Sequence, residues 1–459
     1  MKQLRSLVSV LLAVLVASPA LQAIEKQPAA VYHARREALA AKLHGGVAIL
    51  FAAQQAQLDF DSYRQDEDFY YLTGWNQPGA ALVLVADDPK APNPRAYSEI
   101  LFLPTRDLRL EKYTGPKLDA FTPGVEQSAA VDAVQPMTAL PLAINRLIDS
   151  DRRLLHNLWT QPDAPQATAL VGFLSTTLGI SALPAPAHDV TTPVGQLRLV
   201  KDVGEINLIR KATDASIVAQ RVMMKAAHPG VTERAIAGQM TAAWLTAGCE
   251  RPSYAPIAGS GPNSTILHYS ANDRTMLNGE LLLVDAACEY SMYASDITRT
   301  VPVNGHFTPR QREIYNVVLG ALQAAINAFV AGKSKINDRD RHDPDSLDTA
   351  AFNYINTHSK ALDGQPLGKY WLHGLGHMVG IAVHDPADYP AVLKPGMVFT
   401  IEPGVYIPEE KIGIRIECVF LVGPDGKLID LVANLPHSAE DVEAAMQAET
   451  RLPTVGGPQ

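Results

Sequence analysis

Residues 284–300 read VDAACEYSMYASDITRT and place two aspartates inside an otherwise strand-like part of the chain. Asp285 ends an apolar run, and Asp296 lies beyond a turn that we place near Tyr290 and Ser291. In a hairpin centred on that turn, Asp285 directly faces Asp296, with Cβ atoms about 5 Å apart. Two ionised carboxylates so close together in an apolar setting repel each other, and a divalent cation between them removes the repulsion. We therefore interpret both aspartates as candidate metal ligands.

Residues 400–420, TIEPGVYIPEEKIGIRIECVF, repeat this arrangement with glutamates. Glu402 and Glu417 lie symmetrically about a PEEK turn, so a hairpin brings them face to face. The run IGIRIECVF is largely apolar, which argues against Glu417 as a solvated surface charge. Arg415 shares the strand face of Glu417. It could pair with a carboxylate ligand, contact substrate or play a structural role beside the ligands.

Histidines gather between the two hairpins, in the stretch WLHGLGHMVGIAVHD at residues 371–385. A lone histidine is more often a core or surface residue, but three of the chain's 13 histidines lie here: His373, His377 and His384. Carboxylates with one or two imidazoles and no thiolate favour Mn²⁺, Co²⁺ or Fe²⁺ over a structural Zn²⁺. Four carboxylate charges balance two divalent ions, and such a pair can activate water to hydrolyse an amide.

Length and composition limit the class of protein. The 459 residues suffice for two or three domains, and 47% apolar with 19% charged content is typical of a soluble globular protein. The net charge of −9 argues against nucleic acid as a partner, because phosphate binding requires a basic face. Cys249, Cys288 and Cys418 are scattered, so we interpret them as small buried hydrophobic residues without a disulfide framework.

The first residues have the pattern of an export signal. Lys2 and Arg5 precede an apolar run at residues 7–17, and Ala23 offers a small residue for cleavage. This pattern predicts a signal peptide over residues 1–23 and export to a bacterial periplasm, with no membrane attachment after cleavage. An uncleaved membrane anchor is the alternative, but the apolar run is short for a membrane span.

The remaining chain divides at a Pro-rich stretch near residues 184–193, which predicts a linker. Before it, apolar runs such as VAILFA and SEILFL alternate with helix-like segments, which predicts an α/β domain over residues 24–190. The helical run EINLIRKATDASIVAQRVMMKAA lies near the start of a second domain, which we assign to residues 191–447. We interpret the charged stretch at residues 333–346 as a solvated connection and residues 448–459 as a mobile tail.

Several motifs, in their order and spacing, resemble the metal-dependent "pita-bread" peptidases: HYSAND, VDAACEYSMYASDITRTVPVNGHFT, HGLGHMVG, VHD, TIEPGVY and GIRIE. Within that class the chain is most similar to the aminopeptidase P group. Residues 63–85, YRQDEDFYYLTGWNQPGAALVLV, resemble the N-terminal domain of this group. The resemblance implies an α/β N-terminal domain followed by an α+β pita-bread catalytic domain, with an antiparallel sheet and flanking helices.

The resemblance also assigns site residues by motif. It implies five metal ligands: Asp285, Asp296, His377, Glu402 and Glu417. It implies pocket histidines that contact substrate: His268, His373 and His384. Glu402 is the expected proton shuttle, and with Arg415 these residues form the candidate catalytic set. Two divalent ions are expected, Mn²⁺ first, with Co²⁺ or Zn²⁺ as alternatives. Asp61 matches an acidic position that faces substrate.

The activity implied by the resemblance is release of the first residue from a peptide with an Xaa-Pro N-terminus. An Xaa-Pro bond is a tertiary amide without an N–H group, and a mechanism that acts on the carbonyl alone can cleave it. The alternative enzyme is a prolidase that cleaves Xaa-Pro dipeptides. The alternative without catalysis is a peptide-binding protein of the same fold. The resemblance further implies a homo-oligomer, either a dimer or a tetramer.

Overall fold

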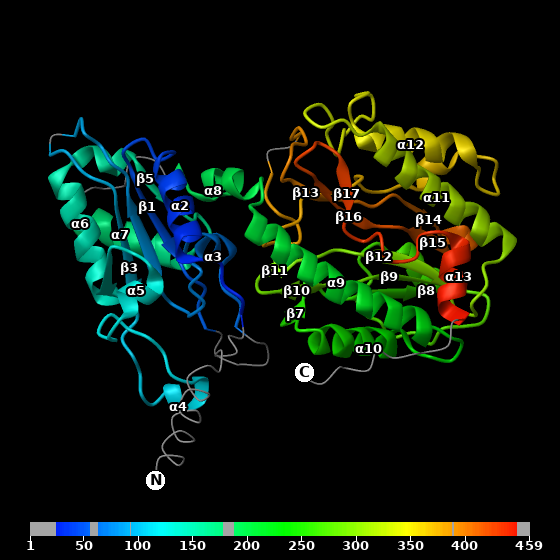
Figure 1. Ribbon diagram of the computed structural model, residues 1–459, viewed down its shortest axis with the longest axis horizontal. Coiled ribbons are helices and arrows are strands. Elements are labelled where there is room, and N and C mark those ends of the chain that lie inside the picture. The colour runs from blue at the N-terminus through cyan, green and yellow to red at the C-terminus, as the bar shows by residue number, and fades with distance from the viewer. Residues whose placement is uncertain (1–23, 56–62, 92, 178–187, 388–389, 448–459) are drawn as a thin grey trace, which may run out of the picture.

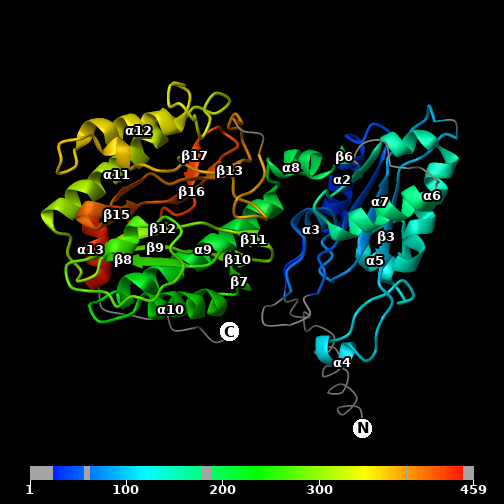
Figure 2. The same cartoon turned by 180° about the vertical axis from the view of Figure 1, so that it is seen from behind.

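The computed structural model describes residues 24–55, 63–91, 93–177, 188–387 and 390–447. The predicted signal peptide, Asp61 and the predicted tail lie outside the described residues. Two domains lie side by side, with helix α8 between them (Figure 1), and Figure 2 shows the same arrangement from behind. Among the described helices, none combines the length and apolar character needed to cross a membrane.

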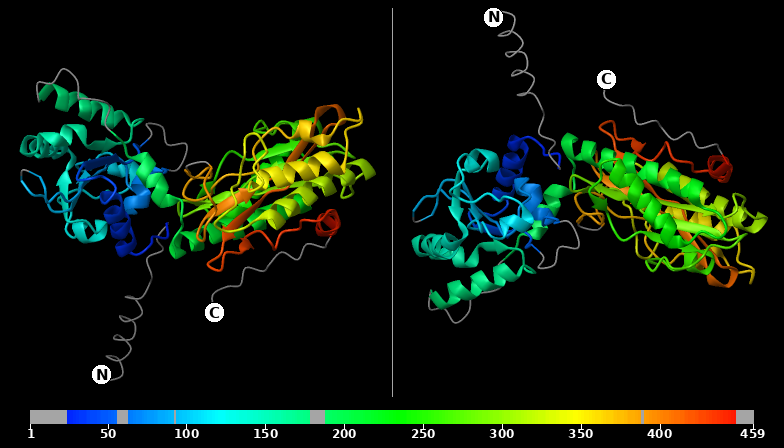
Figure 3. Two further views of the ribbon diagram at one scale, coloured as in Figure 1. Left: turned by 90° about the horizontal axis from the view of Figure 1, so that it is seen from above. Right: turned by 90° about the horizontal axis from the view of Figure 1, so that it is seen from below.

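The N-terminal domain is built on a six-stranded sheet with the order β4-β3-β2-β1-β5-β6. Its strands are β1 Val47–Phe51, β2 Ala81–Val85, β3 Ser98–Leu103, β4 Ala133–Pro136, β5 Leu158–Thr160 and β6 His188–Asp189. β1, β2 and β3 are antiparallel neighbours, whereas β4, β5 and β6 join the sheet in parallel. All residues of β1 and β2 are buried, because helices cover both faces of the sheet (Figure 3). The predicted α/β architecture of this domain is confirmed.

Alternate residues of the central strands enter two different cores. Val47 and Ile49 pack into a cluster with residues of α6 and α7, whereas Ala48 and Leu50 belong to a cluster that continues into the second domain. This alternation follows from the period of two along a strand. The helices of the domain are α2 Ala29–Ala40, α3 Glu67–Thr73, α4 Glu111–Thr114, α5 Val125–Ala129, α6 Leu140–Ser150 and α7 Pro165–Thr177.

Two helices lead from the first domain into the second: α8 Thr191–Arg198 and α9 Val203–Ala226. α9 begins with a capping box, in which the side chains of Asp202 and Glu205 each accept from the other residue's backbone N–H. The predicted helical run coincides with α9. The predicted Pro-rich linker does not persist as a linker, because residues 188–193 form β6 and the start of α8, while residues 184–187 lie outside the described part.

The second domain consists of small antiparallel sheets with helices packed on the outside (Figure 1). Its strands are β7 Arg251–Pro252, β8 Ile257–Ser260, β9 Leu281–Asp285, β10 Cys288–Tyr290, β11 Tyr293–Ala294, β12 Thr298–Pro302, β13 Val398–Ile401, β14 Gly404–Ile407, β15 Ile412–Arg415, β16 Cys418–Val422 and β17 Leu428–Asp430. Its other helices are α10 Glu233–Thr246, α11 Pro309–Ala328, α12 Leu347–His358 and α13 Ala439–Gln447. Short 3₁₀ helices cover Met137–Ala139, Arg152–His156, Gly261–Thr265, Leu367–Tyr370 and Pro408–Glu410. The predicted α+β architecture is confirmed.

The first hairpin differs from the prediction in its register. Thr298, not Asp296, lies opposite Asp285. The turn falls at Ser291 and Met292, whose φ values of +49° and +74° fit the mirror-image turn that matches the twist of a hairpin. Because the pairing is shifted by two positions, Asp296 keeps its expected face and lies diagonally across from Asp285.

The second hairpin has the predicted register. Gly404 pairs with Arg415 and Ile401 pairs with Cys418 in the two ladders that flank the candidate ligands. Glu402 and Glu417 therefore occupy facing positions between these ladders. The turn is the predicted PEEK segment, a 3₁₀ helix at Pro408–Glu410.

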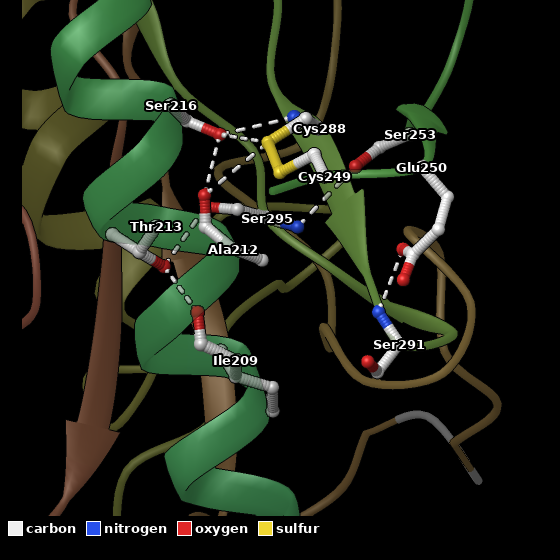
Figure 4. The surroundings of a disulfide bond; sticks show 10 residues. All are labelled: Ile209, Ala212, Thr213, Ser216, Cys249, Glu250, Ser253, Cys288, Ser291 and Ser295. Atoms are coloured by element: carbon white, nitrogen blue, oxygen red, sulfur yellow. Dashed lines mark hydrogen bonds between the residues drawn. A yellow bond between two sulfur atoms is a disulfide. The ribbon is translucent and has the colours of Figure 1, made fainter. Parts of the chain in front are cut away.

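Cys249 and Cys288 form a disulfide, which corrects the prediction that the cysteines are unpaired. The segment after α10 brings Cys249 against β10, where the backbone N–H of Cys288 donates to Ser216 Oγ of α9 at 3.0 Å (Figure 4). The sequence separation of 39 residues conceals this contact, since the two cysteines form no recognisable disulfide pattern. Cys418 is a free and buried thiol, as predicted.

Buried ion pairs around Arg198, at the end of α8, join the two domains. The guanidinium donates to Asp68 of α3 and to Asp385, both at 2.6 Å. Lys201 also donates to Asp385, at 2.9 Å. Asp385 directly follows His384, so these ion pairs fix the loop that carries one of the candidate site histidines.

Candidate metal centre and active site

The four candidate carboxylates lie where strands end. Asp285 is the last residue of β9, and Asp296 precedes β12. Glu402 lies between β13 and β14, and Glu417 lies between β15 and β16. His377 comes from the irregular loop before β13, and all five side chains line one pocket of about 380 Å³. The structure therefore brings together every residue that the sequence nominated as a ligand.

The five candidate ligands form two overlapping donor clusters, beside a third that His384 forms with Asp296 and His377. The donor atoms of Asp285, Asp296 and Glu417 lie within 4.8 Å of one another, as do those of His377, Glu402 and Glu417. Nε2 of His377 lies 3.3 Å from Asp296 Oδ2 and 3.5 Å from Glu402 Oε1. Since Glu417 belongs to both clusters, the geometry suits two cations that share a carboxylate.

The electrostatics of the pocket also favour cations. Burial raises the pKa of Glu417 well above its ordinary value, and the neighbouring charges of Asp296 and Glu402 raise it further. Burial is likewise the main cause that raises the pKa of Glu402 to about 7. Burial acts to lower the pKa of His377, but the hydrogen bond to Asp296 and the charge of Glu402 outweigh it and raise the pKa to about 9. Divalent ions offset this clustered negative charge, so the donor set fits them.

Tyr254 belongs to the site, although sequence analysis missed it. Its hydroxyl oxygen lies 2.5 Å from Asp285 Oδ1 and 2.5 Å from Asp296 Oδ1. Burial, followed by the charges of these two carboxylates, raises the pKa of Tyr254 well above its ordinary value, which keeps the phenol a neutral donor. Tyr254 lies in the loop after β7 and in no recognisable motif, so the sequence holds no local signal for this contact.

Arg415 is occupied by protein partners on three sides. Nη2 donates to Asp285 Oδ2 at 2.6 Å, Nη1 to the Tyr406 hydroxyl at 2.8 Å and Nε to Thr298 Oγ1 at 3.0 Å. Thr298 in turn donates to Glu417 Oε2 at 2.6 Å. Of the alternatives left open by the sequence, pairing with a candidate carboxylate ligand is the one observed.

His373 is held by hydrogen bonds at both ring nitrogens. Nδ1 lies 2.7 Å from the Gly374 carbonyl oxygen, and Nε2 lies 2.8 Å from the Tyr406 hydroxyl. Because a carbonyl can only accept, Nδ1 carries the proton and Nε2 accepts from Tyr406. Burial, followed by the charge of Arg415, lowers the pKa of His373 to about 4, so this ring is neutral.

The other two candidate histidines lie more openly in the pocket. His384 is exposed and contacts the His377 ring edge to face, with ring centroids 4.2 Å apart. Burial, followed by the charge of His377, lowers the pKa of His384. His268 also lines the pocket. The structure thus gathers all the candidate catalytic residues, and their individual roles stay predictions.

The charged stretch at residues 333–346 is not merely a solvated connection, which corrects the prediction. Asn337 lines the pocket, where its Nδ2 donates to the Gly376 carbonyl at 2.7 Å and its Oδ1 accepts from Leu375 N–H at 2.7 Å. Arg341 donates to the His373 carbonyl at 3.0 Å. Both residues fold back onto the histidine loop, residues 371–385, a long-range contact that the local charge pattern does not indicate.

Gly376 allows the histidine loop to approach β13 closely. A Cβ atom at this position would lie 2.1 Å from the Thr400 carbonyl oxygen, closer than any side chain permits. The backbone N–H of His377 donates to Thr400 Oγ1 at 3.0 Å. Thus the glycine places the candidate histidine ligand beside the strand that leads into Glu402.

Comparison with known proteins agrees with this geometry. Residues 207–424 match the model of metallopeptidase family M24, and residues 32–156 match that of the aminopeptidase P N-terminal domain. The chain is similar to the Xaa-Pro aminopeptidase of Escherichia coli strain K12, with 33% identity over 439 residues that cover 91% of this chain and 97% of the relative.

Two solved structures are also similar. Proline aminopeptidase P II from Yersinia pestis has a TM-score of 0.79 and 31% identity, covering 92% of this chain and 99% of that chain. Zinc-substituted E. coli aminopeptidase P in complex with product has a TM-score of 0.79 and 30% identity, with the same coverage. The predicted pita-bread fold, enzyme class and requirement for divalent metal ions are confirmed. The chain therefore belongs to metallopeptidase family M24, as a metal-dependent aminopeptidase that carries the N-terminal domain of the aminopeptidase P group.

Proposed function

We propose that this metalloaminopeptidase releases the N-terminal residue from peptides whose second residue is proline. The observation that carries the proposal is the convergence of four carboxylates and His377 in one pocket of a chain with an aminopeptidase P N-terminal domain. The names of the relatives support the choice, since they are Xaa-Pro aminopeptidases and a proline aminopeptidase.

The five ligands in this proposal are Asp285, Asp296, His377, Glu402 and Glu417. Together they would hold two divalent ions, and their oxygen-rich donor set favours Mn²⁺, with Co²⁺ or Zn²⁺ as alternatives. When bound, such ions supply Lewis acidity and lower the pKa of water towards neutrality. Arg415 and Tyr254 orient Asp285 and leave its position fixed before substrate arrives.

The remaining pocket residues move protons and bind the peptide. Glu402 Oε2 lies 4.0 Å from His373 Nδ1, with the carboxylate facing the pocket, where it can take a proton from water and pass it to the leaving prolyl nitrogen. His268 and His384 lie where they can donate to the peptide carbonyl. None of these steps requires an N–H group on the scissile bond, so a prolyl bond is a suitable substrate.

The alternative is a prolidase, which must neutralise the carboxylate of a dipeptide just beyond the proline. Among the described residues that line the pocket, Arg415 is the single arginine or lysine. Its three nitrogens already bind Asp285, Tyr406 and Thr298. A dipeptide carboxylate therefore lacks a free guanidinium in this pocket, which favours longer peptides.

The test compares three substrates with the Mn²⁺-loaded enzyme: an Xaa-Pro-Xaa-Xaa peptide, an Xaa-Pro dipeptide and an Xaa-Ala-Xaa-Xaa peptide. We expect the first to be cleaved much faster than the other two. Turnover of the dipeptide alone would establish a prolidase. Equal cleavage of the alanine peptide would show that the enzyme does not select for proline.

Export and self-association are separate parts of the proposal. The disulfide between Cys249 and Cys288 supports an oxidising compartment such as the periplasm. Exposed apolar side chains in the N-terminal domain, including Leu108 at 68%, Tyr113 at 82% and Phe121 at 74% exposure, support a dimer or tetramer. N-terminal sequencing of the native protein tests cleavage near Ala23, and light scattering tests the oligomeric state.

A further inference from the structure

A second group of metal-binding side chains lies outside the active-site pocket. Cys418 of β16, Asp430 of β17 and His437, just before α13, bring their donor atoms within 4.8 Å of one another. Cys418 follows Glu417 directly, and adjacent strand residues point to opposite faces, so this cluster lies on the far side of the strand from the candidate active site. The proposed peptidase chemistry uses none of these three residues.

The arrangement does not suit a catalytic Cys–His–Asp triad. In such a triad the acid and the nucleophile hydrogen-bond to different ring nitrogens of the histidine. Here Cys418 Sγ lies 3.1 Å and Asp430 Oδ2 lies 3.5 Å from the same atom, His437 Nε2. One ring N–H cannot point at both partners, whereas one cation can be bound by all three atoms.

The distances are close to those of a zinc site. Zn–S bonds of about 2.3 Å and Zn–N or Zn–O bonds of about 2.0–2.2 Å in a tetrahedron place neighbouring donor atoms about 3.3–3.7 Å apart. The observed separations of 3.1 Å and 3.5 Å approach that geometry within a few tenths of an ångström. A thiolate, an imidazole and a carboxylate are zinc ligands, and water completes the tetrahedron.

Neighbouring groups hold the three side chains in place. Asp430 Oδ1 accepts from the Val432 N–H at 2.7 Å, which leaves Oδ2 facing the histidine. The Tyr315 hydroxyl donates to the His437 carbonyl at 2.9 Å. Arg299 Nη2 donates to Cys418 Sγ at 3.6 Å, a contact that fixes the position of the sulfur.

An ion can reach the cluster from solvent. Cys418 is fully buried, but the side chains of His437 and Asp430 are 26% and 25% exposed. The open side of the cluster is therefore formed by the nitrogen and oxygen ligands, with the sulfur at its base. In such a surface-accessible site, the exposed histidine and aspartate bind the ion first, and the buried sulfur then binds it from below.

We propose that Cys418, Asp430 and His437 bind a zinc ion that ties β16, β17 and the segment before α13 together. The ion is separate from the active-site metals. It anchors the strand whose preceding residue is Glu417, so its loss loosens that side of the catalytic pocket.

Cobalt substitution tests the proposal directly, because a thiolate bound to Co²⁺ gives an intense near-ultraviolet charge-transfer band. Cys418 is the free thiol of the chain, and the candidate active-site ligands include no sulfur, so this band reports the cluster alone. We expect the band in the wild-type protein after chelation and Co²⁺ addition, and its loss when Zn²⁺ is added. Cys418→Ser should abolish it and His437→Gln should weaken it strongly. The matched control His228→Gln, at an exposed histidine, should leave it unchanged.

Zinc stoichiometry gives a second readout that does not depend on Cys418 variants folding well. After equilibrium dialysis, His437→Gln should hold one equivalent of Zn²⁺ less than the wild type and than His228→Gln, with unchanged circular dichroism. A wild-type protein without the charge-transfer band, although its Cys418 reacts as a reduced thiol in denaturant, would overturn the proposal. Equal zinc content in His437→Gln and wild type would do the same.

Discussion

The guanidinium of Arg415 donates to Asp285 at 2.6 Å, and this ion pair spans 130 positions of sequence. The same guanidinium also binds Tyr406 and Thr298, so it orients a candidate metal ligand and does not point freely toward substrate. It is buried to 4% side-chain exposure, with Asp285 at 13%. The position of Asp285 thus depends on an arginine that has three fixed partners.

Arg415→Lys should therefore weaken metal binding. A lysine ammonium cannot hold three partners in the fixed fork of a guanidinium, so Asp285 loses its orientation. We expect Mn²⁺ affinity to fall by about 10–100-fold, as for other groups that orient ligands. Calorimetric titration of the chelated protein measures the change. The control Arg339→Lys, at an exposed arginine, should bind Mn²⁺ like the wild type, and an unchanged affinity in Arg415→Lys would show that Asp285 needs no such support.

Metal removal should destabilise the protein, and more so at higher pH. In the absence of metal, the folded-state pKa of Glu402 is raised from 4.5 to about 7, so its protonated form stabilises the fold below pH 4.5 and this contribution is lost by about pH 7. The pKa of His377 is raised from 6.5 to about 9, and its contribution disappears over that interval. Both groups therefore make the metal-free protein less stable as the pH rises.

We therefore expect the melting temperatures of Mn²⁺-loaded and chelated protein to diverge as the pH rises from 4.5 to about 9. Scanning calorimetry at several pH values measures the difference between the two melting temperatures. Glu402→Gln should shrink this difference over the whole pH range, because the variant lacks one of the proposed metal ligands. A gap that is constant or narrows with pH would contradict the assignment of these two groups to the metal pocket.

Asp385→Asn should destabilise the contact between the domains. The substitution removes the carboxylate that Arg198 and Lys201 share and leaves two buried cations without it. Breaking such a buried pair costs about 3–5 kcal/mol of unfolding free energy. Urea unfolding measures the loss, with the exposed Asp425→Asn as control. A loss below about 1 kcal/mol would place this network among weak surface ion pairs.

The disulfide between Cys249 and Cys288 should contribute measurably to stability. Replacing both cysteines by serine removes a cross-link between residues 39 positions apart, and we expect about 2–4 kcal/mol less unfolding free energy. Reductant should destabilise the wild type by a similar amount and leave the double variant unaffected. If reductant lowers the stability of both proteins equally, the disulfide bond does not account for the loss of stability.

Local patterns predicted much of the fold and most of the candidate site. The second hairpin was predicted in register because the PEEK turn is centred between two apolar strands, and strand symmetry then fixes Glu402 opposite Glu417. The first hairpin was predicted two positions out of register. Its turn uses Ser291 and Met292 at positive φ, and these residue types give no turn signal of the kind that Gly or Asn gives.

Contacts between distant segments could not be predicted in this way. Tyr254 reaches two aspartates 31 and 42 positions away, and nothing in its own neighbourhood marks it. Asn337 lies in a charged stretch that is typical of surface, yet it holds the histidine loop from 39 positions away. Such residues act through tertiary packing, which leaves no periodicity in the sequence.

Metal content and activity of Asp296→Asn provide the most direct test of the central claim that these carboxylates hold the catalytic ions. Asp296 lies in the donor cluster with Asp285 and Glu417 and contacts His377, so its amide variant should lose metal and hydrolysis of an Xaa-Pro peptide together. The matched variant Asp340→Asn, at an exposed aspartate, should keep both. Elemental analysis and peptide turnover on the same Mn²⁺-loaded samples measure the two quantities. Full metal occupancy with wild-type turnover in folded Asp296→Asn would contradict the account.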